Sequence, residues 1–331
     1  MVFGLRGLEG SLKCKQVDND RFEIILSASS LDTWSCCEFK GYLTYVQGAR
    51  DPLSPQDKSL PMWFGDIIHN TVPILRYTGS LEIALNYLEE HFDIPSELQT
   101  NWYGLDRARE VISRYNKVYI PDSFHTLIET SQTGEKIPHF EIHCELPFIH
   151  NNLFTLYLEG YLDNVSYLES KPKRLYNIDL KTSRYAWSEK GRASNWRKAQ
   201  IISDQFVIYN WFLKELYGSR GYSIGGTLLD HIQTSALEIK EKHLNRTTLI
   251  QAILPDTSQV DLLKVRLTRL CEETIIPVFQ GTKKPIANKP AACLMYGGCQ
   301  FLSNVCSLCG GDLDHFVPEL LSGKYQMEKV N

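Results

Sequence analysis

The 331-residue sequence contains no apolar run that approaches the ~20 residues a membrane-spanning helix needs. Its N-terminal residues lack the long apolar stretch of a secretory signal peptide, so we expect a cytoplasmic protein that does not enter a membrane. Positive charge is also scarce, because 35 Lys and Arg against 39 Asp and Glu leave a formal net charge of −4. That balance excludes a protein that is basic over its whole surface, although it allows a local basic face.

The absence of a nucleotide-binding motif and of repeats narrows the range of possible functions. The chain has no G-x-x-x-x-G-K-[S/T] motif, so no ATP-driven motor is expected within it. It has no internal repeat, and 43% hydrophobic with 22% charged residues is an ordinary globular composition. Disordered, collagen-like and coiled-coil chains are therefore excluded. The length corresponds to about two domains of ~150 residues each.

Hydrophobic periodicity divides the chain into three predicted regions. Residues 1–135 are mainly helical, residues 136–245 form a strand-rich core with one crossing helix, and residues 246–331 contain a helix and a cysteine-rich tail. Together they predict an α/β fold. Helical spacing predicts helices over 31–46 (capped by Ser29 or Ser30), 63–75, 81–117 with a break, 196–217 and 257–280. β-Branched and aromatic runs predict strands over 138–149, 152–168, 174–183, 221–233 and 236–244.

The most informative pattern lies in two of these predicted strands. Asp163 lies on one, and Asp179 and Lys181 lie on the next, where alternation places both on the same face. Two carboxylates brought together repel unless a cation lies between them, and oxygen ligands favour Mg²⁺ or Mn²⁺. A lysine beside a metal-bound water suits phosphodiester hydrolysis. The alternatives are an exposed Asp-x-Lys salt bridge and a turn at Asp163.

Two helical pairs accompany these residues. Gly65 and His69 are four residues apart, which places both on one helix face, where the glycine lets another backbone approach and the histidine faces a metal or phosphate. Gln205 and Tyr209 have the same spacing, and their amide and phenol are suited to orienting a nucleotide or the lysine. The alternatives are a core histidine, a core tyrosine and a solvated glutamine.

Taken in order, these pieces resemble the PD-(D/E)xK nuclease superfamily in its RecB-like branch. The matching motifs are GxxxH (Gly65, His69), GxxD (Gly160, Asp163), DxK (Asp179, Lys181) and QxxxY (Gln205, Tyr209). The resemblance implies a restriction-endonuclease-like central mixed sheet flanked by helices. It implies a Mg²⁺ or Mn²⁺ site formed by His69, Asp163, Asp179 and the Leu180 carbonyl, with Lys181 as the catalytic lysine. Gln205 and Tyr209 would line the site.

Nine cysteines provide a second signal, since four of them lie between residues 293 and 309. In a large chain expected in a reducing compartment, such clustering indicates metal ligation. Together with the LSASSLDTWSCC segment, the cluster resembles the iron–sulfur proteins of the same branch, the AddB-type and CRISPR-associated RecB-like exonucleases. The resemblance implies a 4Fe-4S cluster bound by Cys37, Cys293, Cys299 and Cys306. Cys36 and Cys309 compete for these roles, and the alternative is a zinc site formed by Cys293, Cys299, Cys306 and Cys309.

The segment 171–198 carries nine Lys and Arg and two acidic residues, a net charge of +7 in a chain of −4. Three aromatic residues suited to base stacking lie within it, namely Tyr185, Trp187 and Trp196. We therefore expect a metal-dependent DNA exonuclease that acts on single strands or ends in recombination, repair or phage replication, with a helicase or recombination partner. The alternatives are a non-catalytic DNA-end-binding or assembly module and a zinc-dependent DNA-binding regulator.

Overall fold

A computed structural model describes residues 13–18, 21–47, 49–50, 60–92, 104–118, 124–183, 203–234, 248–253, 257–286 and 326–327. The chain forms two compact units, each assembled from segments that are distant in sequence. Unit 1 comprises Met1–Gln56, Glu145–Gly160 and Ser258–Asn331, and unit 2 comprises Asp57–Cys144 and Tyr161–Thr257. The sequence analysis divided the chain into three consecutive regions, with boundaries at 135 and 245. The two units group the chain differently, and those boundaries stay a prediction.

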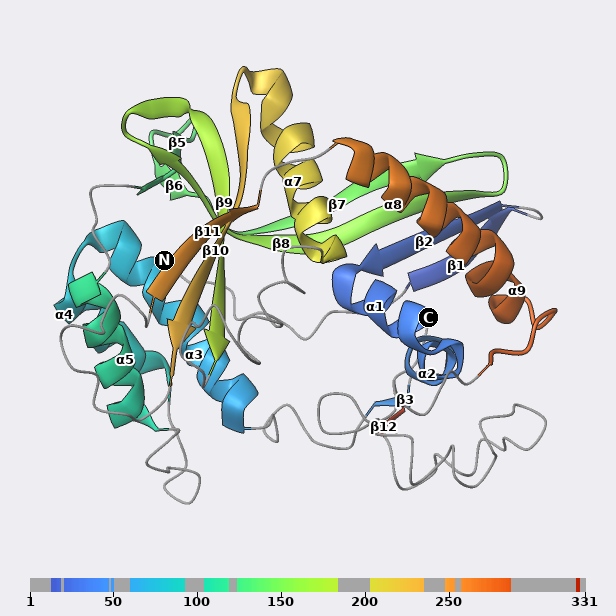
Figure 1. The fold of residues 1–331 in the computed structure, drawn as a ribbon, viewed down its shortest axis with the longest axis horizontal. Coiled ribbons are helices and arrows are strands. Elements are labelled where there is room, and N and C mark those ends of the chain that lie inside the picture. Colours follow the sequence, from blue (N-terminus) through green and yellow to red (C-terminus); the bar gives the residue numbers. More distant parts are fainter. Residues whose placement is uncertain are drawn as a thin grey trace. The chain divides into compact units, whose positions relative to one another are not determined.

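Unit 1 is built on a short sheet with helices beside it (Figure 1). Strands β1 (Lys13–Asp18) and β2 (Arg21–Ser27) pair antiparallel, and β2 pairs in parallel with the first residues of β8 (Phe154–Leu168). Alternate residues of β2 are fully buried, which is the two-residue period of a strand with one face in the core. The remaining elements are α1 (Ala28–Cys36), α2 (Glu38–Gly41), the π-helix η1 (Tyr42–Val46), β3 (Ala49–Arg50), α8 (Thr257–Leu270), the π-helix η6 (Cys271–Ile275), α9 (Ile276–Phe279) and β12 (Gln326–Met327).

The helix predicted over 31–46 is interrupted, and its cap is Ser27, two or three residues before the predicted Ser29 or Ser30. Ser27 is the N-cap, because its hydroxyl accepts from the Ser30 backbone N–H while the Ser30 hydroxyl accepts from the Ser27 N–H. At Cys37 the backbone is extended, with φ −161° and ψ 110°, so the helix stops there. The Cys37 Sγ then accepts from the Lys40 N–H at 3.4 Å and caps α2. These two side chain–backbone bonds decide the boundaries.

Unit 2 contains the sheet that carries the site. The last residues of β8 pair antiparallel with β9 (Lys171–Ser183), β9 pairs in parallel with β10 (Ser223–Gln233), and β10 pairs antiparallel with β11 (Thr248–Ile253). This is the predicted mixed sheet. The short β4 (His125–Thr126) and β7 (Phe140–His150) also pair with β8, and β5 (Ile128–Thr130) and β6 (Lys136–Pro138) form a separate hairpin.

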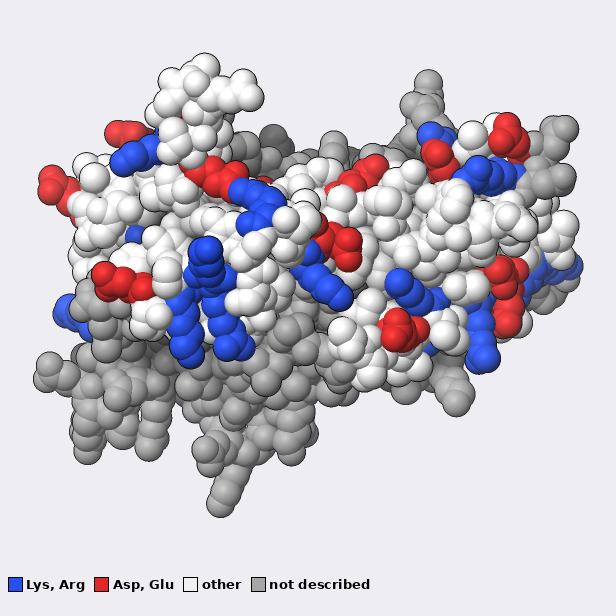
Figure 2. All heavy atoms as spheres, turned by 90° about the horizontal axis from the view of Figure 1, so that it is seen from above, with Lys and Arg blue, Asp and Glu red and all other residues white. Residues whose placement is uncertain are grey.

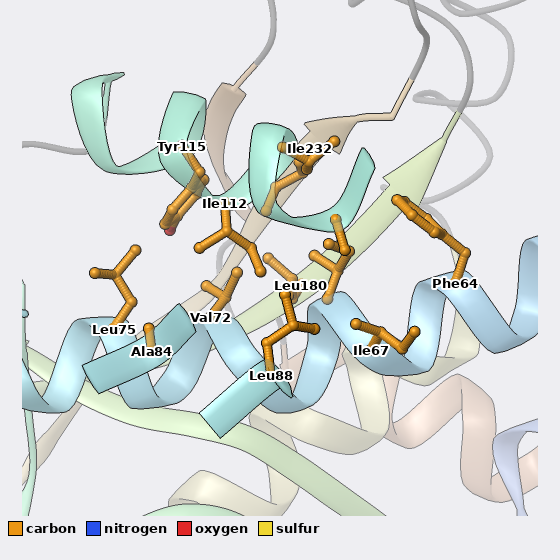
Figure 3. Packing of buried hydrophobic residues seen from close by; sticks show 13 residues of the cluster. Phe64, Ile67, Val72, Leu75, Ala84, Leu88, Ile112, Tyr115, Leu180 and Ile232 are labelled. Carbon is orange, nitrogen blue, oxygen red and sulfur yellow. The ribbon is translucent and has the colours of Figure 1, made fainter. Parts of the chain in front are cut away.

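Helices cover both faces of the β9–β10 pair. On one face, α3 (Leu60–Thr78), α4 (Leu81–His91) and α5 (Leu105–Val118) pack their apolar stripes together with Leu180 of β9 and Ile232 of β10 (Figure 3). On the other face lies α7 (Asp204–Tyr217), where Asn210 accepts a hydrogen bond from Thr227 of β10 at 2.9 Å. The 3₁₀ turn η4 (Gly218–Arg220) follows α7. The predicted central sheet flanked by helices is confirmed.

Most predicted elements of the strand-rich region are present, with boundaries shifted by a few residues. The helix predicted over 257–280 is α8, a π-helical turn and α9 in succession. The strand predicted over 236–244 lies outside the described residues. Among the helices that the structure describes, none has the length and hydropathy needed to cross a membrane.

Candidate active site

The ladder between β8 and β9 ends two residues before the two predicted aspartates. The ladder pairs Tyr167 with Leu175 and Val165 with Asn177, so the same register continued by two residues would oppose Asp163 and Asp179. Residues directly opposite in an antiparallel pair have their side chains on one face. Instead of continuing the ladder, Asp163 Oδ2 accepts from the Leu180 N–H at 3.1 Å. The strands therefore separate where the carboxylates begin.

The Leu180 backbone is directed toward Asp163. In a β-strand the N–H and C=O of one residue point to the same edge, so the Leu180 carbonyl faces the β8 side together with its N–H. Its side chain is 3% exposed and packs in the core with α3. This apolar anchor holds the peptide between Asp179 and Lys181 in place.

Asp179 and Lys181 lie on the face of β9 that α7 covers, as alternation predicts. Asp179 is fully buried. Its Oδ1 accepts a hydrogen bond from Lys181 Nζ at 3.2 Å, and its Oδ2 lies 3.0 Å from the same nitrogen as an ion pair. The Lys181 side chain keeps 24% of its surface exposed, whereas the Asp179 side chain keeps 1%. A buried carboxylate joined to a partly exposed cation leaves one end of the ion pair accessible to a substrate.

His69 reaches Asp163 from α3. Its Nδ1 lies 3.6 Å from Asp163 Oδ2, which is longer than a hydrogen bond but within ion-pair range if the ring is protonated. One turn earlier, a Cβ added to Gly65 would lie 3.2 Å from Thr182 Oγ1. The glycine therefore permits close packing of α3 against β9, next to Lys181. The partner of this approach is a side chain, whereas we predicted a backbone.

Gln205 and Tyr209 form a pair on α7. The Gln205 amide donates to the Tyr209 hydroxyl at 2.8 Å, and Tyr209 is buried while Gln205 is half-buried. Ser203 caps this helix, since its hydroxyl accepts from the Gln205 N–H. The helix that carries the pair, α7, covers the face of the sheet on which Asp179 lies. Its role in a reaction stays a prediction.

The side chains proposed to bind the metal contact one another in pairs, and the described residues do not bring them into one set of ligands. Asp163 contacts His69 and the Leu180 N–H, and Asp179 contacts Lys181. Within the described parts of the chain, no group of three or more His, Cys, Asp or Glu side chains is placed to share a metal ion. Even so, two carboxylates and a carbonyl directed to one strand edge fit the chemistry of Mg²⁺, which takes one or two carboxylates and keeps several waters.

The structure adds a pair that the motif search missed. His231 of β10 is in register with Lys181 and thus shares its face, and its Nε2 lies 2.7 Å from Ser183 Oγ. Burial lowers the pKa of His231 from 6.5 to about 4, so the ring is neutral beside the lysine strand. Only the pairing of β9 with β10 reveals this pair, although the spacing Lys181-x-Ser183 was visible.

Only part of the predicted metal cluster and basic segment is described. Cys37 is 7% exposed at the junction of α1 and α2, whereas Cys36 is exposed. Cys293, Cys299, Cys306 and Cys309 lie outside the described residues, as do residues 184–198 of the basic segment. Figure 2 shows basic and acidic side chains interspersed on the face it draws, and neither sign forms a continuous field among the described residues there.

A mixed sheet that brings Asp163, Asp179 and Lys181 to one separating strand pair is the arrangement expected of an α/β phosphodiester hydrolase. The comparison with protein families agrees, because the family model of the PD-(D/E)XK nuclease superfamily matches residues 25–307. The chain belongs to that superfamily. No protein in the search of curated proteins matches the chain.

Among solved structures, the chain is similar to a "putative exonuclease" from Eubacterium rectale. The two share 15% identity with a TM-score of 0.40, over 79% of this chain and 83% of the other. The family assignment rests on the family model, which spans most of the chain.

Proposed function

We propose that the protein is a metal-dependent nuclease that hydrolyses DNA phosphodiesters, acting as an exonuclease on single strands or ends. One observation carries this proposal: Asp163 of β8 accepts a hydrogen bond from the Leu180 N–H of β9, and the residues on either side of Leu180, Asp179 and Lys181, form an ion pair. A structural salt bridge would explain Asp179 and Lys181 but not the second buried carboxylate on the next strand.

In this proposal Asp163, Asp179, His69 and the Leu180 carbonyl hold Mg²⁺ or Mn²⁺. A divalent cation bound there polarises the scissile phosphate and lowers the pKa of a water molecule. Side chains of the protein supply the remaining catalytic roles. Lys181 presents a positive charge from a side chain that is 24% exposed, close enough to the surface to orient a water or a phosphate oxygen. The neutral His231 adds no second positive charge beside it.

Gln205 and Tyr209 are proposed to line the site from α7. Their mutual hydrogen bond leaves the second amide hydrogen of Gln205 available as a donor. Such a group suits the orientation of a nucleotide or of Lys181. Ser203 caps α7 six residues before Tyr209, which keeps both side chains on a rigid element.

We propose DNA as the substrate and the basic segment 171–198 as its contact. Binding of phosphates by this segment would make affinity fall steeply with salt. Recombination, repair or phage replication, with a separate helicase or recombination protein, is the context that the RecB-like resemblance suggests. Of the segment, Lys171, Lys173, Arg174 and Lys181 are on β9.

A 4Fe-4S cluster bound by Cys37, Cys293, Cys299 and Cys306 completes the proposal. Its support is the path of the chain toward the cysteine-rich tail. Phe39 N–H donates to the Ile286 carbonyl at 3.2 Å, and the Ile286 N–H donates to Glu38 at 3.3 Å. The chain therefore passes beside Cys37 only seven residues before Cys293, a span of at most ~25 Å.

The nuclease proposal is tested with end-labelled single- and double-stranded DNA and RNA, each with Mg²⁺ and with Mn²⁺. Lys181→Ala should abolish cutting, whereas Lys173→Ala, an exposed lysine on the same strand, should retain it at low salt. DNA binding without cutting by the wild-type protein would favour the end-binding module. Undiminished cutting by Lys181→Ala would remove the proposed mechanism.

The cluster is tested by iron and zinc analysis and by visible absorbance of anaerobically purified protein. Cys37→Ala should lose iron and the brown colour, while Cys36→Ala, its exposed neighbour, should keep both. Iron loss in Cys36→Ala alone would shift the ligand by one position. A colourless protein that contains zinc would replace the cluster by the four-cysteine zinc site.

A further inference from the structure

A buried trio of charged and polar side chains joins α3, α5 and β10. Tyr115 of α5 donates to Asp230 Oδ2 at 2.7 Å, and Arg76 of α3 pairs with the same oxygen. Arg76 also donates to the Tyr115 hydroxyl at 2.6 and 2.9 Å. The Arg76 side chain is 4% exposed and Asp230 is fully buried, so this ion pair is closed to solvent.

The trio is connected to the candidate site on two sides. Asp230 is in register with Leu180, the residue whose N–H holds Asp163. Arg76 follows His69 by seven residues on α3, which is two helical turns and therefore the same helix face. The trio thus holds the strand next to the catalytic strand and the helix that carries His69.

Pro73 makes this attachment important. It lies inside α3 between His69 and Arg76, and it has no N–H to bond to the His69 carbonyl four residues earlier. The missing hydrogen bond weakens the helix at the turn that follows His69. Three residues after Pro73, the ion pair at Arg76 attaches α3 to the buried Asp230 of β10 and holds the helix close to this weak turn.

We propose that Arg76, Tyr115 and Asp230 form a positioning anchor that sets the placement of the His69 ring against Asp163, and through it the affinity of the site for a divalent cation. The metal part of this inference rests on the proposed function; the anchor itself does not. A merely structural trio would stabilise the fold without coupling to His69.

The experiment uses the full chain with Tyr115→Phe, which deletes one hydroxyl, and Arg76→Lys, which keeps the charge but not the fork of donors. The control is Glu89→Gln in the exposed Arg109–Glu89 pair, which joins α5 to α4 without touching β10. Two quantities are measured: the Mn²⁺ dissociation constant, and the ring NMR signals of His69 in the metal-free protein, assigned with His69→Gln. Each variant is also made in a His69→Ala background.

The anchor predicts that Tyr115→Phe and Arg76→Lys shift the His69 ring signals and raise the Mn²⁺ dissociation constant about 5-fold or more, and that Glu89→Gln changes neither. In the His69→Ala background the same substitutions should leave the remaining Mn²⁺ affinity within 2-fold, because the coupling partner is gone. Unmoved ring signals would overturn the anchor even if stability falls. If the wild-type protein binds no Mn²⁺, the proposed function fails, while the ring signals still decide the anchor.

Discussion

Two fully buried aspartates lie on neighbouring strands of unit 2, and they are satisfied in opposite ways. Asp230 on β10 faces α3 and α5, where Arg76 and Tyr115 enclose it. Asp179 on β9 faces α7, and its partner Lys181 is 24% exposed. The first carboxylate is part of a closed network, and the second ends in a cation at the surface.

The exposure of the partner distinguishes a carboxylate with a structural role from one that is suited to take part in a reaction. A closed ion pair costs several kcal/mol of desolvation and repays it only by excellent geometry, so it contributes through position and specificity. In a partly exposed ion pair, the carboxylate can bind another cation and the lysine can bind a phosphate. Burial alone does not distinguish them, since both aspartates are fully buried; the exposure of the partner does.

The largest expected effect concerns activity at Asp179. Asp179→Asn removes a charge that the proposed metal site requires, so cleavage of end-labelled DNA should fall roughly 10³- to 10⁴-fold. The urea midpoint should hardly change, because Lys181 stays solvated. A strongly destabilised variant would place Asp179 in the same structural class as Asp230.

The matching substitution on the other strand should cost stability. Asp230→Asn leaves the Arg76 guanidinium buried without a countercharge, and breaking a buried pair in this way costs about 3–5 kcal/mol. Urea unfolding, compared with the exposed-pair control Glu89→Gln, measures the free energy of unfolding. A loss below about 1 kcal/mol would contradict the closed network.

The pH dependence of the free energy of unfolding should report on His231, which lies on the same face of the sheet as Asp179. His231 has a folded pKa of about 4, below its ordinary value of 6.5, so the unfolded chain binds the proton first as pH falls. Stability is therefore full above pH 6.5 and decreases between 6.5 and about 4, by roughly 3 kcal/mol. His231→Gln should flatten this part of the urea midpoint against pH. An unchanged slope would show that another group titrates there.

The smallest effect is expected at the contact of α3 with β9. Gly65→Ala gains helix propensity of about 1 kcal/mol but brings a Cβ to 3.2 Å from Thr182 Oγ1. Since a hydroxyl can rotate away, we expect a change within about 1 kcal/mol and a modest loss of activity. The double variant Gly65→Ala/Thr182→Ala removes the hydroxyl that the new Cβ meets; a large loss that persists in it would locate the conflict at the backbone.

Local patterns predicted much of this site. The two-residue period placed Asp179 and Lys181 on one face, and the four-residue spacing placed Gln205 next to Tyr209, which now share a hydrogen bond. Boundaries set by side chain–backbone bonds were predicted less well. The reciprocal cap at Ser27 and the extended residue Cys37 depend on geometry that spacing does not encode.

No local sequence pattern predicts which side chains that are distant in sequence contact one another. Asp230 and His231 are consecutive residues in a strand, and nothing in their spacing says that one pairs with Arg76 of a distant helix and the other lies beside Ser183. Figure 3 shows why: the apolar cluster that brings these elements together draws residues from α3, α4, α5, β9 and β10.

By itself, the amino-acid sequence determined the α/β class, the order of helices and strands around the site, and the four motifs, because each depends on residue types and periods within one element. Only the tertiary structure decided that the β8–β9 ladder ends before Asp163, that the Leu180 N–H donates to Asp163, and that Asp230 is enclosed while Lys181 is partly exposed. The physical reason is that register, strand separation and burial are properties of pairs of elements. They follow from how distant segments pack, and no single segment contains that information.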